Sequence, residues 1–207
     1  DHPHAAFVAE YLVGDDWGTL GLLEDCGFDL FIDIKFGWLL YDVLNDKNQE
    51  KPDYFKSYLR SRLESGKMPK MLIYKDGHDI RDAARQDNDH GQERMRYLTE
   101  DQANLAMLLM ATLPDVPMFY NGELEAVLGY EYRVGQATPI QWNDFIERRR
   151  AFNMRIAELA NEPIFRRGSA RMLNPKGLDN PNIVAFVREY DGESVIVAAN
   201  IGNTGRQ

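Results

Sequence analysis

One stretch of the chain decides how the rest is interpreted: Met71-Leu-Ile-Tyr-Lys-Asp-Gly-His-Asp-Ile-Arg-Asp82. Its first four residues form an apolar run of the length that is typical of a buried strand. The run ends abruptly in ionisable residues around Gly77. In a parallel barrel, the residues at the C-terminal ends of the strands face the substrate, and this pattern is typical of such a strand. The alternative is a strand followed by an ordinary polar turn.

Three further apolar runs flank this stretch, and each leads into a polar or acidic residue. They are residues 5–9 followed by Glu10, residues 27–33 ending in Asp33, and residues 116–120 followed by Asn121. Asp33 has a second interpretation, as a cap for the segment that follows it. Runs of this length, bounded by polar residues, predict strands.

Helical spacing of apolar residues separates these runs. We expect a short helix or turn at residues 20–23, and helices at residues 36–44, from Pro52 to Gly66, and at 103–112 after a capping box that begins at Thr99. Strands that alternate with helices are typical of a parallel α/β fold.

The pattern changes after Pro139. A long amphipathic helix is predicted at residues 142–159, and three strand-like runs follow it at residues 167–173, 183–190 and 194–201. Asp191-Gly192 separates the last two runs and is a strong hairpin signal. We therefore expect an antiparallel segment, and a domain boundary that divides the chain into residues 1–161 and residues 162–207.

Composition excludes several classes of protein. The 207 residues are 44% hydrophobic and 28% charged, which is ordinary for a globular protein, and the net charge of −9 argues against nucleic acid or an anionic membrane as partner. No apolar run approaches the length of a membrane span. Cys26 is the single cysteine, so no intrachain disulfide is expected. The chain opens on Asp1 rather than Met, and we expect it to be part of a longer protein.

Four motifs, in order, resemble those of the α-amylase family of glycoside hydrolases. Phe7-Val-Ala-Glu10 resembles the motif of the fifth barrel strand, Gly77-His-Asp79 that of the seventh, and Leu113-Pro-Asp-Val-Pro-Met-Phe-Tyr-Asn-Gly122 that of the eighth. Residues 184–188 and 195–200 resemble the first strands of the family's C-terminal domain. The resemblance implies a partial (β/α)8 TIM barrel, its second half, over residues 1–161. It implies the beginning of an antiparallel β-sandwich over residues 162–207.

The resemblance also implies roles for individual residues. Glu10 matches the general acid/base of these retaining enzymes, and Asp79 matches a carboxylate that stabilises the transition state by binding sugar hydroxyls. His78 matches a residue that donates a hydrogen bond to the same sugar, and Arg81 is a further candidate for substrate binding. Tyr120 is a candidate for stacking on a sugar ring, with core packing as the alternative.

The chain departs from the family pattern in several places. It has no Gly-x-Arg-x-Asp stretch, which carries the family's nucleophile on the strand before the acid/base. Gly77 replaces the usual Asn, Arg81 follows Asp79 by two positions rather than three, and Leu124 stands where a Glu is expected. We therefore expect the chain to be inactive alone, and to associate with itself or with a missing half-barrel.

The expected function is that of a fragment of a retaining α-glycosidase that acts on α-glucans or related oligosaccharides. A transglycosidase of the same family and a non-catalytic carbohydrate-binding or assembly protein remain alternatives, as does an unrelated parallel-barrel enzyme. We expect no cofactor and no metal. The loop Asp87-Asn-Asp-His90 is acidic, but Gly91 stands where an EF-hand would need a ligand.

Overall fold

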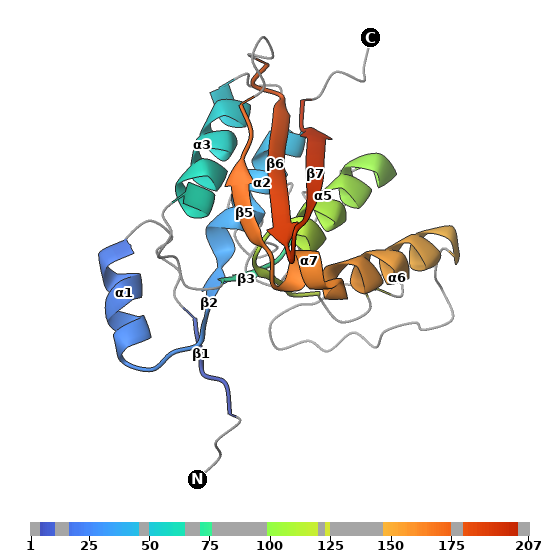
Figure 1. Cartoon of the computed structure of the whole chain (residues 1–207). Helices are drawn as coiled ribbons and strands as arrows, with labels where there is room; N and C mark the ends of the chain where they lie inside the picture. Colours follow the sequence, from blue (N-terminus) through green and yellow to red (C-terminus); the bar gives the residue numbers. More distant parts are fainter. Residues whose placement is uncertain are drawn as a thin grey trace, which may run out of the picture.

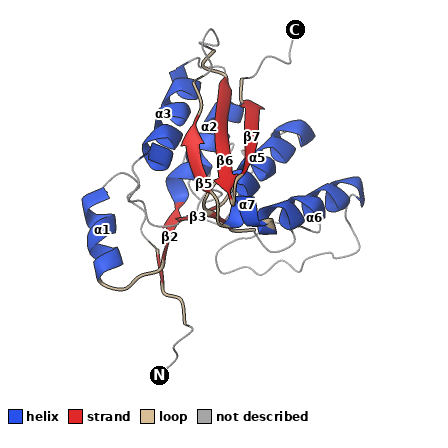
Figure 2. Cartoon of the chain, viewed as in Figure 1, coloured by secondary structure: helices blue, strands red, loops and turns tan. Residues whose placement is uncertain are grey.

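The computed structural model describes residues 5–10, 17–45, 50–64, 71–75, 99–119, 123–124, 147–174 and 180–202. Strands alternate with helices in the first part of the chain, and three consecutive strands close it (Figures 1 and 2). This order confirms the α/β fold with one parallel and one antiparallel sheet. No helix in these ranges has the length and apolar character that a membrane crossing requires.

The first sheet has four short parallel strands in the order β1-β2-β3-β4. The strands are β1 (Val8–Ala9), β2 (Leu30–Asp33), β3 (Met71–Ile73) and β4 (Val116–Pro117). Helix α1 (Trp17–Asp25) connects β1 to β2, and α2 (Ile34–Asn45) and α3 (Glu50–Glu64) lie between β2 and β3. Each strand was predicted, although β1 and β4 are shorter than their apolar runs.

Helix α5 (Glu100–Thr112) begins at the predicted capping box. The Thr99 hydroxyl accepts a hydrogen bond from the Gln102 backbone N–H, and the Gln102 side chain accepts one from the Thr99 backbone N–H. Two N–H groups that the helix leaves unpaired are satisfied in this way. Glu100 and Asp101 add negative charge at the positive end of the helix dipole. The sequence therefore specifies where α5 begins.

Two helices lead from the parallel sheet to the antiparallel one. Helix α6 (Glu147–Asn161) was predicted, and its Arg148 forms a surface ion pair with Glu100 of α5. Helix α7 (Pro163–Arg166) was missed. Its proline stands in the first turn, where a missing backbone N–H costs nothing, but one turn of helix leaves no periodic pattern to detect.

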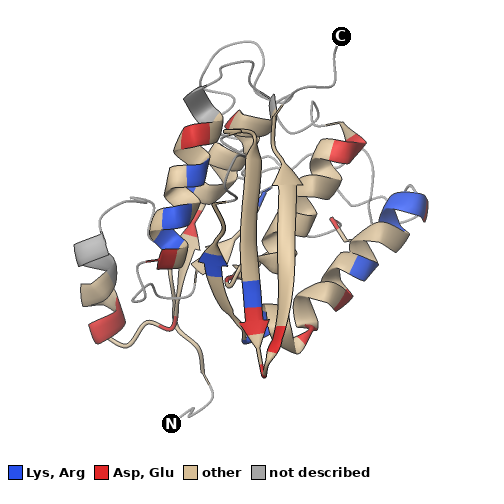
Figure 3. Cartoon of the chain, turned by 45° about the horizontal axis from the view of Figure 1, so that its top comes forward, with Lys and Arg blue, Asp and Glu red and all other residues tan. Residues whose placement is uncertain are grey.

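The second sheet is antiparallel, in the order β5-β6-β7. It comprises β5 (Ser169–Met172), β6 (Ile183–Tyr190) and β7 (Glu193–Asn200). The predicted hairpin joins β6 to β7, with φ of 50° at Asp191 and 80° at Gly192. Positive φ at both positions is the geometry of a type I′ turn, which Asp-Gly favours. Acidic residues gather at this end of the sheet, and basic residues lie along α3 and at one end of α6 (Figure 3).

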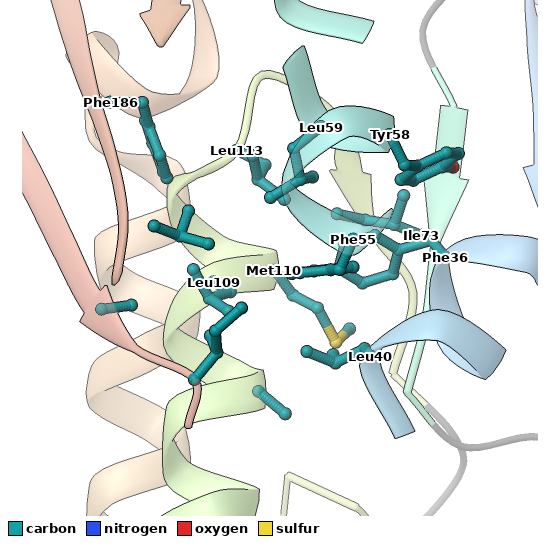
Figure 4. Close-up of a cluster of buried hydrophobic side chains, with 14 of the residues drawn as sticks. Phe36, Leu40, Phe55, Tyr58, Leu59, Ile73, Leu109, Met110, Leu113 and Phe186 are labelled. Carbon is teal, nitrogen blue, oxygen red and sulfur yellow. The ribbon is translucent and has the colours of Figure 1, made fainter. Parts of the chain in front are cut away.

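A shared hydrophobic core joins the two sheets through the helices. Helix α3 packs against β5, and α5 packs against both β4 and β7. Phe186 of β6 points toward Leu109 of α5, while Ile73 of β3 and Phe36 of α2 lie on the far side of Met110 (Figure 4). Each fully buried side chain of this size contributes about 1.5–3 kcal/mol relative to an exposed one.

Arg188 of β6 fixes how the antiparallel sheet docks. The side chain is fully buried and donates to four carbonyl oxygens: Thr112, Phe165 at 2.7 Å, Gly168 at 2.7 Å and Ser169 at 3.1 Å. These carbonyls belong to the ends of α5 and α7 and to the start of β5. Burial lowers the pKa of Arg188 to about 10, against the opposing attraction of Asp115, so the guanidinium is still charged at neutral pH.

Replacing Gly168 by Ala is expected to destabilise this junction. A Cβ at position 168 would collide with the carbonyl of Ile164 and lie 2.8 Å from the carbonyl oxygen of Glu189, both of which are rigid backbone. We expect a loss of about 1–3 kcal/mol, as for overpacking in a core, measured by urea unfolding. Gly21→Ala in α1 is the matched control, since its Cβ would meet no atom within 4 Å and Ala favours a helix. Equal stability of the two variants would contradict this account.

Candidate active site

Glu10 lies at the C-terminal end of β1, on the face of the sheet that the helices leave uncovered. Val8 pairs with Leu30 and Ala9 with Phe31, so alternation decides the faces. Ala9 and Phe31 are buried in the core under the helices, whereas Val8 is 44% exposed. Glu10 is the next residue, so it shares the face of Val8, and it is exposed.

The C-terminal ends of all four strands meet at one edge because the sheet is parallel. Asp33, the last residue of β2, pairs with Ile73 of β3, and Ile73 pairs with Pro117 of β4. The segments that follow β3 and β4 therefore leave the sheet on the same side as Glu10. The notebook of candidate residues beyond these strand ends, namely Asp79, His78, Arg81 and Tyr120, lies outside the described residues.

Asp33 has a structural role, as the capping interpretation predicted. One carboxylate oxygen, Oδ1, accepts a hydrogen bond of 2.9 Å from the backbone N–H of Phe36 in α2. The other, Oδ2, accepts hydrogen bonds from the Tyr58 hydroxyl and, at 2.6 Å, from Arg62. Asp33 is 2% exposed. Both oxygens are engaged on the helix side of the sheet, away from the face that carries Glu10.

Arg62 of α3 bridges two buried carboxylates. Its two terminal nitrogens lie 2.6 Å from Asp33 and 2.6 Å from Asp115, which precedes β4. Asp115 also accepts a hydrogen bond of 3.2 Å from the backbone N–H of Met71, the first residue of β3. The network therefore ties α3 to three adjacent strands of the parallel sheet.

The charges in this network are set by burial and by their neighbours. Burial raises the pKa of Asp115, and the attraction to Arg62 counteracts part of that rise. Burial opposes the charge of Arg62, but Asp115, Tyr58 and Asp33 together raise its pKa above the usual value. Burial raises the pKa of Tyr58 well above the ordinary range, so its hydroxyl keeps the proton that it donates to Asp33.

A second buried ion pair lies at the C-terminal edge itself. The ammonium of Lys75, just beyond β3, contacts Oε1 of Glu123, which lies in the turn after β4. The two side chains are 11% and 9% exposed. Glu123 was expected near this edge, whereas Lys75 was missed. A lysine directly after an apolar strand, with a glutamate after the neighbouring strand, is the signal that could have indicated the pair.

No group of three or more His, Cys, Asp or Glu side chains in the described ranges is arranged to hold a metal ion. The loop at residues 87–90 lies outside those ranges.

Comparisons with known proteins give matches in structure only. No protein-family model matches the sequence, and no curated protein matches it. A maltogenic α-amylase, AmyB from Thermotoga neapolitana, superposes with a TM-score of 0.68 at 14% identity, over 95% of this chain and 41% of its own. The chain has the fold of part of an α-amylase.

Two other enzymes of this fold give similar values. The α-amylase from H. orenii superposes with a TM-score of 0.62 at 19% identity, over 95% of this chain and 43% of its own. A cyclomaltodextrinase superposes with a TM-score of 0.64 at 20% identity, over 95% of this chain and 32% of its own. The chain thus spans less than half the length of the α-amylases and the cyclomaltodextrinase that it matches. The resemblance read from its motifs is confirmed at the level of the fold.

Proposed function

We propose that this chain is part of a retaining α-glycosidase that acts on α-glucans or related oligosaccharides, and that Glu10 is its general acid/base. The observation that carries the proposal is the place of Glu10. It is exposed at the C-terminal end of a parallel strand, on the face away from the helices, in a fold shared with α-amylases. Enzymes built on parallel barrels carry their catalytic residues at that end of the strands.

In this proposal the four parallel strands are consecutive strands of a (β/α)8 barrel. Residues 1–161 form its second half, and residues 162–207 begin an antiparallel β domain. Two observations support this: the strands pair in the order of the chain, and the core under them is covered by helices that connect those strands. One face of the sheet is left for the interior of the barrel.

The proposed chemistry divides the work between two carboxyl groups. The carboxylic acid of Glu10 protonates the oxygen of the leaving sugar, and a carboxylate about 5–5.5 Å away attacks the anomeric carbon. Asp79 stabilises the transition state by accepting hydrogen bonds from sugar hydroxyls. His78 and Arg81 bind the same sugar, and Tyr120 stacks on it.

The nucleophile is proposed to come from outside these 207 residues. Asp33 is the other acid at the end of an early strand, and its geometry argues against the role. Its two oxygens are held by Phe36, Tyr58 and Arg62, and the side chain is buried among the helices. We call this chain together with the strands that carry the nucleophile the assembled enzyme.

The chain alone is expected not to hydrolyse maltoheptaose at a measurable rate, and not to remain a monomer. β1 and β4 are the edge strands of the parallel sheet as described, and exposed edges pair with other chains. Hydrolysis is measured by the release of reducing ends, and the mass of the particle by light scattering. Either a second copy or the missing half-barrel would satisfy those edges.

The Glu10→Gln chain is the control for this measurement, because it reports contaminating activity. Turnover that is equal in both preparations comes from a contaminant. Turnover by a monomer that disappears in Glu10→Gln would contradict the proposed absence of the nucleophile, while supporting the role of Glu10.

A further inference from the structure

The strongest unassigned feature of the molecule is the ion pair between Lys75 and Glu123. Lys75 lies two residues beyond the end of β3, and Glu123 lies in the turn that follows the neighbouring strand β4. Their contact therefore joins the C-terminal ends of two adjacent parallel strands. Both side chains are about nine-tenths buried, so water screens their attraction little.

Glu123 is also held from the opposite side, by α6. The side-chain amide of Asn153 donates a hydrogen bond of 2.8 Å to the backbone carbonyl of Glu123. Asn153 is 4% exposed, and the next residue of the turn, Leu124, packs with Ile156 of the same helix. The turn after β4 is thus fixed by its backbone to α6 and by its side chain to the end of β3.

Stability alone does not explain a buried ion pair at this place. Removing two charges from water costs several kcal/mol per ion, and an apolar pair of similar volume is often as stable or more so. An ion pair differs from an apolar pair in direction, because it fixes where the two groups sit. That property matters most where neighbouring strands present functional groups.

We propose that Lys75 and Glu123 are positioning residues of the active site, which set the ends of β3 and β4 relative to each other. This rests on the proposed function, in which His78 and Asp79 follow Lys75 by three and four positions and Tyr120 precedes Glu123 by three. Neither member of the pair touches the reacting atoms. Their role is to hold the segments that do.

The test compares single and double replacements. Lys75→Met and Glu123→Leu each leave a buried charge unpaired, so each is expected to lower the melting temperature of the 207-residue chain. The double variant replaces the pair by two apolar side chains and is expected to regain the melting temperature. In the assembled enzyme, its kcat on maltoheptaose is nevertheless expected to stay at least tenfold below that of the unaltered protein. The charge-reversed pair, Lys75→Glu with Glu123→Lys, is expected to recover part of that kcat.

Arg155→Met is the matched control, because Arg155 forms an ion pair of 2.6 Å with Glu158 on the exposed surface of α6. It should change neither the melting temperature nor kcat. A double variant that regains both stability and kcat would show a purely structural pair and overturn the proposal.

Amide hydrogen exchange of the 207-residue chain separates this inference from the proposed function. In the stable double variant, exchange is expected to rise in peptides that contain β3 and Glu123, and to stay unchanged in β6. If exchange rises but the assembled enzyme does not cleave glucan, the proposed function fails and the positioning of the strand ends stands. Unchanged exchange near β3 would overturn the positioning role whatever the activity.

Discussion

Replacing Glu10 by Gln is expected to lower the hydrolysis of maltoheptaose by the assembled enzyme by roughly 10²–10⁴-fold, the usual contribution of general acid/base catalysis. Gln has the shape of Glu but no acidic proton, so the leaving oxygen would depart as an alkoxide. Glu10 is exposed and caps no helix in the described structure, so the substitution should leave the fold intact. The measurement is kcat, with the melting temperature determined on the same preparation.

Glu24→Gln provides the matched control for this loss. Glu24 is an exposed glutamate of α1 and is far in sequence from every proposed site residue. Its replacement removes the same charge from the same surface class and should leave kcat unchanged. A Glu10→Gln enzyme that retains full activity on maltoheptaose would eliminate the acid/base role.

Replacing Arg62 by Met is expected to cost about 3–5 kcal/mol of unfolding free energy, as for a buried ion pair that loses one partner. The change would strand two buried carboxylates, Asp33 and Asp115, whose negative charges Arg62 now shares. A loss of that size is a large part of the stability of most domains. Chemical unfolding in urea, followed by circular dichroism, measures it.

Arg60→Met, two positions earlier in α3, is the control. Its ion pair with Glu64 is 3.8 Å long, and both side chains are more than 40% exposed, so we expect a change of at most about 1 kcal/mol. If Arg62→Met were no more destabilising than Arg60→Met, the network would not hold α3 to the sheet as described.

Local signals in the sequence predicted most of the fold. The Asp191-Gly192 dipeptide defines its hairpin because only a few residue types tolerate positive φ at both positions. The capping box at Thr99 defines the start of α5 because its two hydrogen bonds involve residues only three apart. Both signals depend on neighbours in the chain, which is why they can be read without a structure.

Contacts between distant segments could not be predicted in this way. Arg188 stands among apolar residues of β6, and its burial depends on carbonyls from α5, α7 and β5. No periodicity of its own strand announces those partners. The pairing of Lys75 with Glu123 was missed for the same reason, since 48 residues separate them and only the adjacency of β3 and β4 brings them together.

For the candidate site, the sequence predicted one position that the structure describes. Glu10 was expected at the end of a strand, and β1 does end beside it. Asp33 had the same local pattern, an acid at the end of an apolar run, yet it is buried on the other face. The pattern alone could not separate the two, because a strand of two to four residues leaves its register, and so its exposed face, undefined.

The central claim, that Glu10 is the acid of a glycosidase, is tested most directly by the leaving-group dependence of the Glu10→Gln assembled enzyme. The measurement compares kcat on maltoheptaose with the first-turnover burst of dinitrophenolate from 2,4-dinitrophenyl maltoside. Dinitrophenolate leaves without a proton, so this account predicts a loss of less than about tenfold in the burst rate, against roughly 10²–10⁴-fold on maltoheptaose. Equal losses on the two substrates, or no loss on either, would contradict it.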